Sequence, residues 1–273
     1  MKHAIITCSD ANCGDFLINN WLKSLKDNVN LENIDVVVID YGLSKEHLKE
    51  LKENNIIVYK AKKDGFPNAI KFRDILVFLD NKEYDQILTC DCADLIFQTD
   101  IKELLETDKT EFRAVIEGMT MPYEKIMSDW CFDRETARQI KQSSNRKRMI
   151  NMGMIVAPCS RFRLLCKECD KLLKTKTYIA DQITVNHLLY KYSFKEISHK
   201  YNFIPMTSNE EFEIKNGEFY LISGEKIAIV HNVGGTMSLR IIKNFGYGHN
   251  KNQLNKTLFY TMRTFIRTMN YFR

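Results

Sequence analysis

Short apolar segments that end at polar turns recur along the chain, and helical patterns lie between them. Segments this short and this continuously apolar are typical of strands buried on both faces of a sheet. Strands that alternate with amphipathic helices predict an α/β fold with a mostly parallel, doubly wound sheet. The predicted strands are Ala4–Thr7, Val36–Ile39, Ile56–Tyr59, Ile87–Cys90, Ala114–Ile116, Met154–Ala157 and Ile227–Val230, and the predicted helices are Asp15–Leu25, Ser44–Asn54, Asn68–Leu79, Ser160–Lys174 and Asp181–Tyr192.

Composition places the chain among globular proteins. It has 273 residues, of which 44% are hydrophobic and 27% charged, and this balance excludes a disordered or fibrous protein. No internal repeat or low-complexity tract is present. We expect one large domain over residues 1–236, with a mostly polar helical insert at Pro122–Arg148, and a basic helical extension over residues 237–273.

Two acidic residues, Asp91 and Asp94, directly follow the predicted strand Ile87–Cys90. Ligands of open α/β sheets bind beyond the carboxyl ends of the strands, which is where this turn lies. Two carboxylates on one turn can hold Mg²⁺ or Mn²⁺ and leave coordination positions for a substrate diphosphate. The alternative is that both are solvated loop acids or helix caps.

His231 ends the predicted strand Ile227–Val230 and is followed closely by Gly234 and Gly235. Glycines let backbone N–H groups approach an anionic ligand. Because imidazole and carboxylates together suit Mn²⁺, His231 is a candidate third metal ligand. A purely structural histidine is the alternative.

Two further segments carry polar side chains at element ends. Asn151 and Gly153 precede the predicted strand Met154–Ala157, and Asp181 and Gln182 begin a helix, whose N-terminus favours an acid. Taken alone, Asn151 could be a turn residue and Asp181 a helix cap.

The order of these segments resembles that of the GT-A glycosyltransferases, in particular the family 8-like group that uses nucleotide sugars. The resemblance extends from Ala4 to Gly235. It rests on an opening strand, a basic helix with Lys71 and Arg73, an acidic turn, an Asn-x-Gly strand, an Asp-Gln helix and a final His-x-x-Gly segment. One departure is that two residues separate the acids of the turn, whereas the family's usual turn is Asp-x-Asp.

The resemblance implies a GT-A (Rossmann-like) fold and a role for each matching residue. Metal ligands for Mn²⁺ or Mg²⁺ would be Asp91, Asp94 and His231; donor contacts would be Thr7, Ser9, Asp10, Arg73, Gly153 and Gly234; and residues acting on the sugar would be Asn151, Asp181 and Gln182.

The implied reaction moves a hexose from a nucleoside diphosphate sugar, a UDP-sugar in our interpretation, to a hydroxyl of a glycan or lipid-linked glycan, with retention of configuration. A sugar-1-phosphate nucleotidyltransferase is a second hypothesis. It would carry a Gly-rich basic phosphate loop after the first strand, which Thr7–Gly14 lacks. A non-catalytic nucleotide-binding module is a third.

Basic residues are concentrated at the end of the chain. From Met237 to Arg273 there are seven basic residues and no acidic one, in a protein of net charge +5. This asymmetry favours a basic appendage over a nucleic-acid-binding face. An amphipathic helix from Leu254 predicts contact with an anionic membrane, with Arg263 and Arg267 facing the lipid headgroups. Packing on the protein's own body, or in a dimer, is the alternative. The apolar residues of this helix are Leu254, Leu258, Met262, Phe265, Ile266, Met269 and Phe272.

The eight cysteines are best interpreted as free thiols in a reducing cytoplasm. The first residues show no signal peptide, and no run approaches the roughly 20 apolar residues that span a bilayer. We therefore expect a cytoplasmic protein, peripheral at the inner face of a membrane where its C-terminal helix binds.

Overall fold

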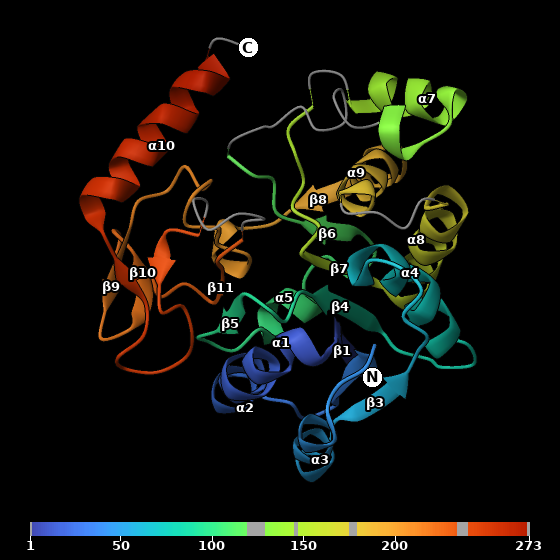
Figure 1. Ribbon diagram of the computed structural model, residues 1–273, viewed down its shortest axis with the longest axis horizontal. Coiled ribbons are helices and arrows are strands. Elements are labelled where there is room, and N and C mark those ends of the chain that lie inside the picture. Colours follow the sequence, from blue (N-terminus) through green and yellow to red (C-terminus); the bar gives the residue numbers. More distant parts are fainter. Residues whose placement is uncertain (1, 119–128, 145–146, 175–178, 234–239, 272–273) are drawn as a thin grey trace.

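The computed structural model describes residues 2–118, 129–144, 147–174, 179–233 and 240–271. A seven-stranded sheet in the order β3-β2-β1-β4-β7-β6-β8 forms the centre of the molecule (Figure 1). Its strands are β1 (His3–Ser9), β2 (Ile34–Asp40), β3 (Ile57–Lys60), β4 (Gln86–Cys90), β6 (Phe112–Ala114), β7 (Met154–Pro158) and β8 (Phe194–Glu196). Only β7 runs antiparallel to its neighbours, so the prediction of a mostly parallel α/β sheet is confirmed.

Helices cover both faces of this sheet, because neighbouring residues on each strand point to opposite sides. Ile5 packs with α2 and α3 on one face, whereas Ile6 packs with α4 and α8 on the other. The helical segments are α1 (Ala11–Phe16), η1 (Leu17–Leu22), α2 (Lys23–Asn28), α3 (Lys45–Glu53), α4 (Pro67–Phe78), α5 (Lys102–Glu106), α7 (Arg134–Ser144), α8 (Cys159–Leu172), α9 (Ala180–Tyr192), η2 (His199–Tyr201) and α10 (Lys256–Tyr271).

Local signals fix the starts of several helices. The Ser44 side chain accepts a hydrogen bond from the His47 backbone at the start of α3, and Pro67 occupies the first turn of α4, where its missing N–H costs nothing. The Asp10 side chain caps α1 in the same way, immediately after β1. The starts of α3 and α4 therefore lie close to their predicted positions, whereas α1 begins at Ala11, before the predicted start at Asp15.

The predicted strand Ile227–Val230 differs from expectation, because it lies outside the main sheet. The observed strand β11 (Ile229–His231) pairs antiparallel with β5 (Leu95–Phe97). A hairpin of β9 (Phe212–Lys215) and β10 (Glu218–Leu221) packs beside this pair around an aromatic cluster. Two short strands, β12 (Ile242–Lys243) and β13 (Gln253–Leu254), then lead into α10.

The first half of α10 packs on the body of the protein. Phe259 is buried against Phe212 of the hairpin, and the buried Arg263 donates hydrogen bonds to the backbone carbonyls of Ser208 and Glu210. The expectation that Arg263 faces lipid headgroups is therefore wrong, because its guanidinium is occupied inside the protein. The side chain of Arg267 lies outside the described residues, as does the predicted domain boundary between residues 236 and 237.

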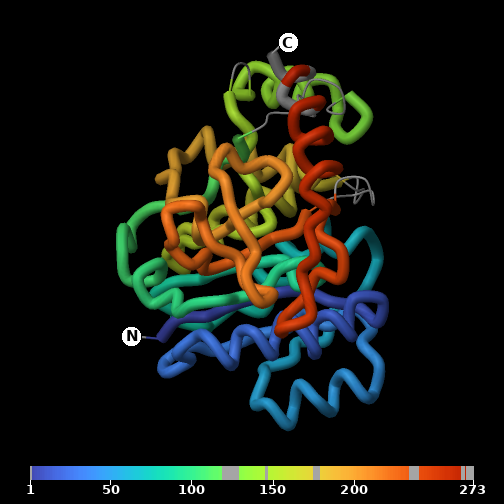
Figure 2. Tube along the Cα trace, turned by 90° about the vertical axis from the view of Figure 1, so that its left-hand side faces the viewer, coloured from blue at the N-terminus to red at the C-terminus, as the bar shows by residue number. Residues whose placement is uncertain are grey.

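The rest of α10 projects away from the sheet and its helices (Figures 1 and 2). Phe265 is exposed on this part of the helix, and Leu258 and Tyr260 are exposed on the first half. Membrane contact through this part of the helix stays a prediction. Within the described chain, none of the helices has the length and apolar character needed to cross a bilayer.

We predict that Phe259→Ala lowers the free energy of unfolding by about 3–5 kcal/mol, the usual cost of emptying a buried aromatic site. The side chain is only 2% exposed and holds α10 to the hairpin. Phe265→Ala is the matched control, since Phe265 is 62% exposed, and it should change stability by less than about 0.5 kcal/mol. Urea unfolding followed by circular dichroism measures both. Equal effects would show that α10 is not anchored through Phe259.

Candidate active site

A cavity of about 720 Å³ lies at the carboxyl ends of β1 and β4. This is the position that a doubly wound sheet offers to a ligand, and the volume is typical of a small-molecule site. Of the residues predicted from the sequence, its wall contains Ser9, Asp10, Asp91, Asp94, Asn151, Gly153, Asp181, Gln182 and His231.

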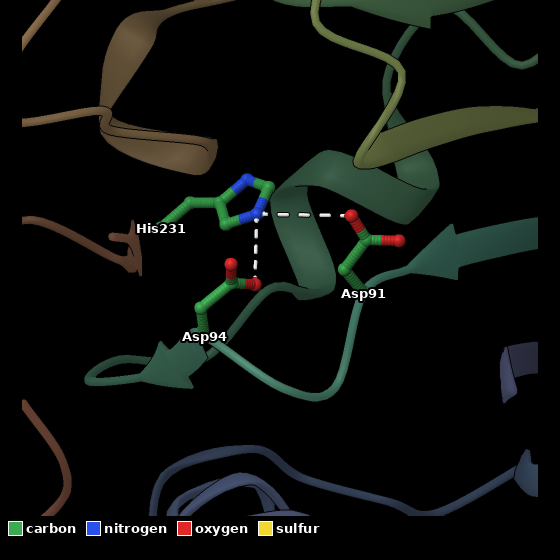
Figure 3. A group of neighbouring side chains, drawn as sticks. All are labelled: Asp91, Asp94 and His231. Carbon is green, nitrogen blue, oxygen red and sulfur yellow. Dashed lines mark ion pairs between the residues drawn. The ribbon is translucent and has the colours of Figure 1, made fainter. Parts of the chain in front are cut away.

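The pairing of β11 with β5 brings His231 to the acidic turn. His231 is opposite Leu95 in this ladder, and the Asn232 backbone N–H donates to the Asp94 carbonyl at 2.8 Å. As a result, His231 Nε2 lies 3.2 Å from Asp94 Oδ1 and 3.9 Å from Asp91 Oδ2 (Figure 3). Three candidate ligand atoms, one from each residue, lie within 4.8 Å of one another.

Each carboxylate of this cluster also contacts a cation through its other oxygen. Lys71 Nζ donates to Asp91 Oδ1 at 3.1 Å, and Arg240 Nη2 contacts Asp94 Oδ2 at 2.8 Å. The two ion pairs leave Asp91 Oδ2 and Asp94 Oδ1 directed at the imidazole. The side chains are therefore oriented before any ligand binds.

Charge interactions shift the pKa values of the cluster. Burial alone raises the pKa of Asp94, but the neighbouring His231 and Arg240 outweigh it and lower the pKa below its usual value. Burial lowers the pKa of His231, whereas the Asp94 carboxylate raises it, and the net shift is upward. Burial disfavours the charged form of Lys71, but Asp91 raises its pKa overall, so Lys71 stays a cation.

The cluster fits a divalent cation. Carboxylate oxygens with one imidazole are a donor set that suits Mn²⁺, and Mg²⁺ accepts the oxygens. His231 Nε2 is buried and forms no well-aligned hydrogen bond within the described residues, although carboxylate oxygens of Asp94 and Asp91 lie 3.2 and 3.9 Å away, so a cation held between them would complete it.

Gly153 gives this cluster the space it needs. A β-carbon at this position would lie 2.2 Å from His231 Cε1 and 3.0 Å from Asp91 Oδ2. The Gly153 carbonyl also accepts a hydrogen bond from the Asp91 backbone at 2.8 Å, which fixes the start of the acidic turn. The glycine therefore permits a close approach that no side chain would allow.

Asp181 and Gln182 also line the cavity and lie in the first turn of α9, which begins at Ala180. Burial raises the pKa of Asp181 from 3.8 to about 6, although the positive charge of Lys71 opposes the shift. Gln182 accepts a hydrogen bond from the Met152 backbone and donates one to the Ile150 carbonyl, so its amide also holds the segment before β7. Contacts of these residues with a sugar stay predictions.

Near the start of α1, Asp10 pairs with Lys63 at 2.6 Å, and both line the cavity. Burial opposes the ionised form of Asp10, but the hydrogen bond from Lys63 lowers its pKa overall. Ser9 lines the cavity next to Asp10. This end of the cavity therefore presents a carboxylate and an ammonium group close together.

The structure does not place Thr7 or Arg73 on the cavity wall. Thr7 is buried within β1. Arg73 forms ion pairs with Asp64 and Asp74, and Lys71 contacts the acidic cluster instead. The two side chains point in different directions because a separation of two residues on a helix corresponds to a rotation of about 200°. Their predicted donor contacts are therefore unsupported, and Gly234 lies outside the described residues.

Three residues at or beside the cavity were not predicted from the sequence: Glu117, Asn202 and Arg240. Glu117 is a buried acid on the cavity wall that accepts a hydrogen bond from Asn151 Nδ2 at 2.8 Å, and burial raises its pKa. It directly follows the predicted strand Ala114–Ile116, so the rule that located Asp91 could have located it. No local pattern distinguishes Asn202 or Arg240.

A mostly parallel sheet with an Asp-Asp-His cluster at its carboxyl edge is the arrangement expected of a GT-A glycosyltransferase. The sequence profile of glycosyl transferase family 8 matches residues 20–237. The chain therefore belongs to glycosyltransferase family 8 and is a glycosyltransferase. A search of curated protein sequences gave no match.

Solved structures share the fold. An active-site glutamine-to-glutamate variant of LgtC has a TM-score of 0.58 at 14% identity, covering 85% of this chain and 88% of LgtC. The galactosyltransferase LgtC in complex with donor and acceptor sugar analogs has a TM-score of 0.54 at 15% identity, covering 96% and 95%. The bifunctional glycosyltransferase WbbM, without ligand, has a TM-score of 0.55 at 15% identity, covering 86% of this chain and 46% of WbbM.

We predict that Gly153→Ala weakens Mn²⁺ binding at least tenfold, because the added methyl group would push the His231 ring away from Asp91. Electron paramagnetic resonance of free Mn²⁺ measures the affinity. Gly246→Ala is the control, since its β-carbon would be just as crowded, 2.3 Å from Asn20 Oδ1, but lies outside the cavity wall. Unchanged Mn²⁺ affinity in Gly153→Ala would contradict the close packing of this cluster.

Asp181→Asn should raise stability above pH 6 while lowering turnover at least tenfold. The pKa of Asp181 is about 6 in the folded protein and 3.8 ordinarily, so the free energy of unfolding falls as the pH rises between these two values. The substitution should recover up to about 3 kcal/mol at pH 8 and much less at pH 4. Thermal unfolding at both pH values measures this difference. If Asp181→Asn changed stability equally at both pH values, ionisation of Asp181 would not destabilise the folded protein.

Proposed function

We propose that this glycosyltransferase moves a hexose from a UDP-sugar to a hydroxyl of a glycan acceptor, with retention of anomeric configuration, and that it needs Mn²⁺ or Mg²⁺. The observation that carries the proposal is that Asp91, Asp94 and His231 converge in one cavity with Asp10 and Asp181. Retention rests on the family resemblance alone.

The residues of the cluster would hold the cation against the donor diphosphate. A divalent cation supplies charge stabilisation to the diphosphate as the bond between sugar and phosphate breaks. Asp94 Oδ1 and Asp91 Oδ2 lie 3.2 Å and 3.9 Å from His231 Nε2, close enough for the three atoms to share one cation. Lys71 keeps Asp91 in this orientation through the other oxygen.

The remaining cavity residues would bind the two ends of the donor. Asp10 and Lys63 offer an acceptor and a donor of hydrogen bonds to the nucleoside. Asp181, buried in the wall of the cavity, would stabilise positive charge that develops on the sugar ring. Positioning and electrostatics of this kind need no strong nucleophile.

The acceptor is the least defined part of the proposal. LgtC has been crystallised with donor and acceptor sugar analogs, and its fold covers nearly all of this chain. By this likeness we propose a sugar hydroxyl as the acceptor. The cavity, at about 720 Å³, has the size of sites that bind ligands larger than one hexose.

The test is release of nucleoside diphosphate from a panel of nucleotide sugars with Mn²⁺, Mg²⁺ or a chelator. We expect UDP release that depends on the cation, and loss of at least a hundredfold in Asp94→Ala. Asp80→Ala, which changes an exposed acid outside the cavity, should keep full activity. Turnover in excess chelator would contradict the metal requirement, and no release from any donor would contradict the proposed reaction.

A further inference from the structure

A buried asparagine lies directly behind the imidazole of the metal cluster. Asn202 is fully buried just after η2. Backbone hydrogen bonds from Phe203 to the Ile229 carbonyl and from His231 to the Phe203 carbonyl hold this segment against β11. The position of Asn202 relative to His231 is therefore set by main-chain pairing.

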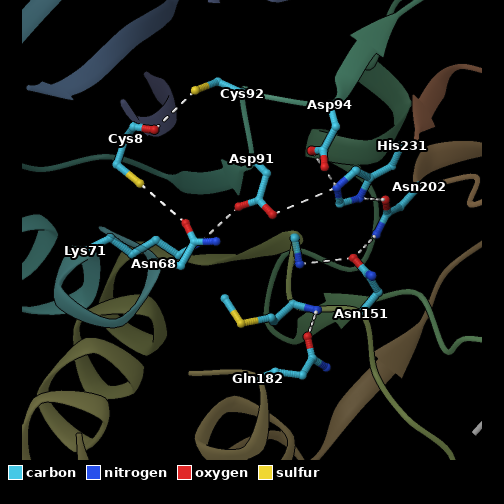
Figure 4. A network of polar contacts seen from close by, with 12 residues as sticks. Cys8, Asn68, Lys71, Asp91, Cys92, Asp94, Asn151, Gln182, Asn202 and His231 are labelled. Atoms are coloured by element: carbon cyan, nitrogen blue, oxygen red, sulfur yellow. Dashed lines mark hydrogen bonds and ion pairs between the residues drawn. The ribbon is translucent and has the colours of Figure 1, made fainter. Parts of the chain in front are cut away.

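The hydrogen bonds around Asn202 determine which atom of each neighbouring amide is the oxygen and which is the nitrogen (Figure 4). The Gly153 backbone N–H donates to Asn151 Oδ1 at 3.0 Å, so this atom must be the oxygen of the amide. Asn202 Nδ2 donates to the same oxygen at 2.9 Å, and Asn202 Oδ1 therefore faces His231 Nδ1 at 3.0 Å. An oxygen in this place requires the proton of the ring to be on Nδ1.

The hydrogen bond between Asn151 and Glu117 supports the same orientation of the Asn151 amide. Asn151 Nδ2 donates to Glu117 Oε1 at 2.8 Å, which places the amide nitrogen of Asn151 against a carboxyl oxygen. Turning Asn151 around would set its nitrogen against the Gly153 N–H and its oxygen against Glu117. A fixed backbone donor and a buried carboxyl group thus determine both amides.

We propose that Asn202 is a positioning residue that keeps a proton of His231 on Nδ1, so that Nε2 is the ring nitrogen available to a cation held with Asp91 and Asp94. The inference deepens the proposed metal site and rests on it. Metal-binding histidines commonly donate their second ring N–H to a neighbouring group, which fixes the tautomer and the ring orientation. Here an asparagine would do so, linked through Asn151 to Glu117.

Asn202→Leu removes the acceptor at nearly constant volume and should raise the Mn²⁺ dissociation constant about tenfold to a hundredfold. Asn202→Asp keeps an oxygen opposite Nδ1 but sets its second oxygen against Asn151 Oδ1, so it should lose less Mn²⁺ affinity than Asn202→Leu. Asn28→Leu is the control, since it also removes an amide with several hydrogen bonds but one that does not line the cavity, and it should lower only the melting temperature. Each purified protein is first shown by circular dichroism to be folded. Titration with Mn²⁺, followed by electron paramagnetic resonance, then gives its dissociation constant.

A second measurement separates this inference from the metal site itself. ¹⁵N spectra of the metal-free protein at alkaline pH, with His231 assigned from His231→Gln, should show the proton on Nδ1 in wild type and a mixture of tautomers in Asn202→Leu. Equal Mn²⁺ affinities in wild type and Asn202→Leu, or equal losses in the Leu and Asp variants, would overturn the role of Asn202. If wild type binds no Mn²⁺, the metal site of the proposed function fails, and the ¹⁵N spectrum alone decides the tautomer.

Discussion

The short antiparallel pairing between β5 and β11 is the interaction on which the site depends, because it joins the acidic turn to a histidine far away in the sequence. A buried glutamine supports it. Gln98 donates from its backbone to the Ala228 carbonyl and from its amide to the Phe219 and Ile227 carbonyls, and it accepts from the Phe219 backbone. Loss of these bonds would leave several buried polar groups unpaired, so the register of β11 is strongly specified.

Charge balance explains how two acids can stay close together beside a sheet edge. Asp91 and Asp94 would repel each other if both were ionised alone, but Lys71 and Arg240 each neutralise one. Lys71 comes from α4 and Arg240 from the segment before β12, so the cluster joins two segments that are far apart in the sequence.

The sheet was largely predictable because its signals are local. The apolar run Ile87–Cys90 and the cap at Ser44 depend only on neighbouring residues, and both lie where the pattern places them. Ile227–Val230 was misplaced because its apolar run is compatible with any buried pairing, and the choice of β5 as partner is a tertiary one. The same limit applies to Arg73, whose direction on α4 depends on where Asp64 and Asp74 lie.

The site residues divide in the same way. Asp91, Asp94 and His231 were found because the ends of strands are recognisable, and Glu117 follows that rule too. Asn202 does not, since it ends a short helical turn and acquires its role only when β11 pairs beside it. A candidate metal-binding side chain can thus be found because it lies at the end of a strand. The residue that would orient it comes into contact with it only through the pairing of distant segments. This difference explains why Asp91, Asp94 and His231 could be located from the sequence, whereas Asn202, which we propose orients the imidazole, could not.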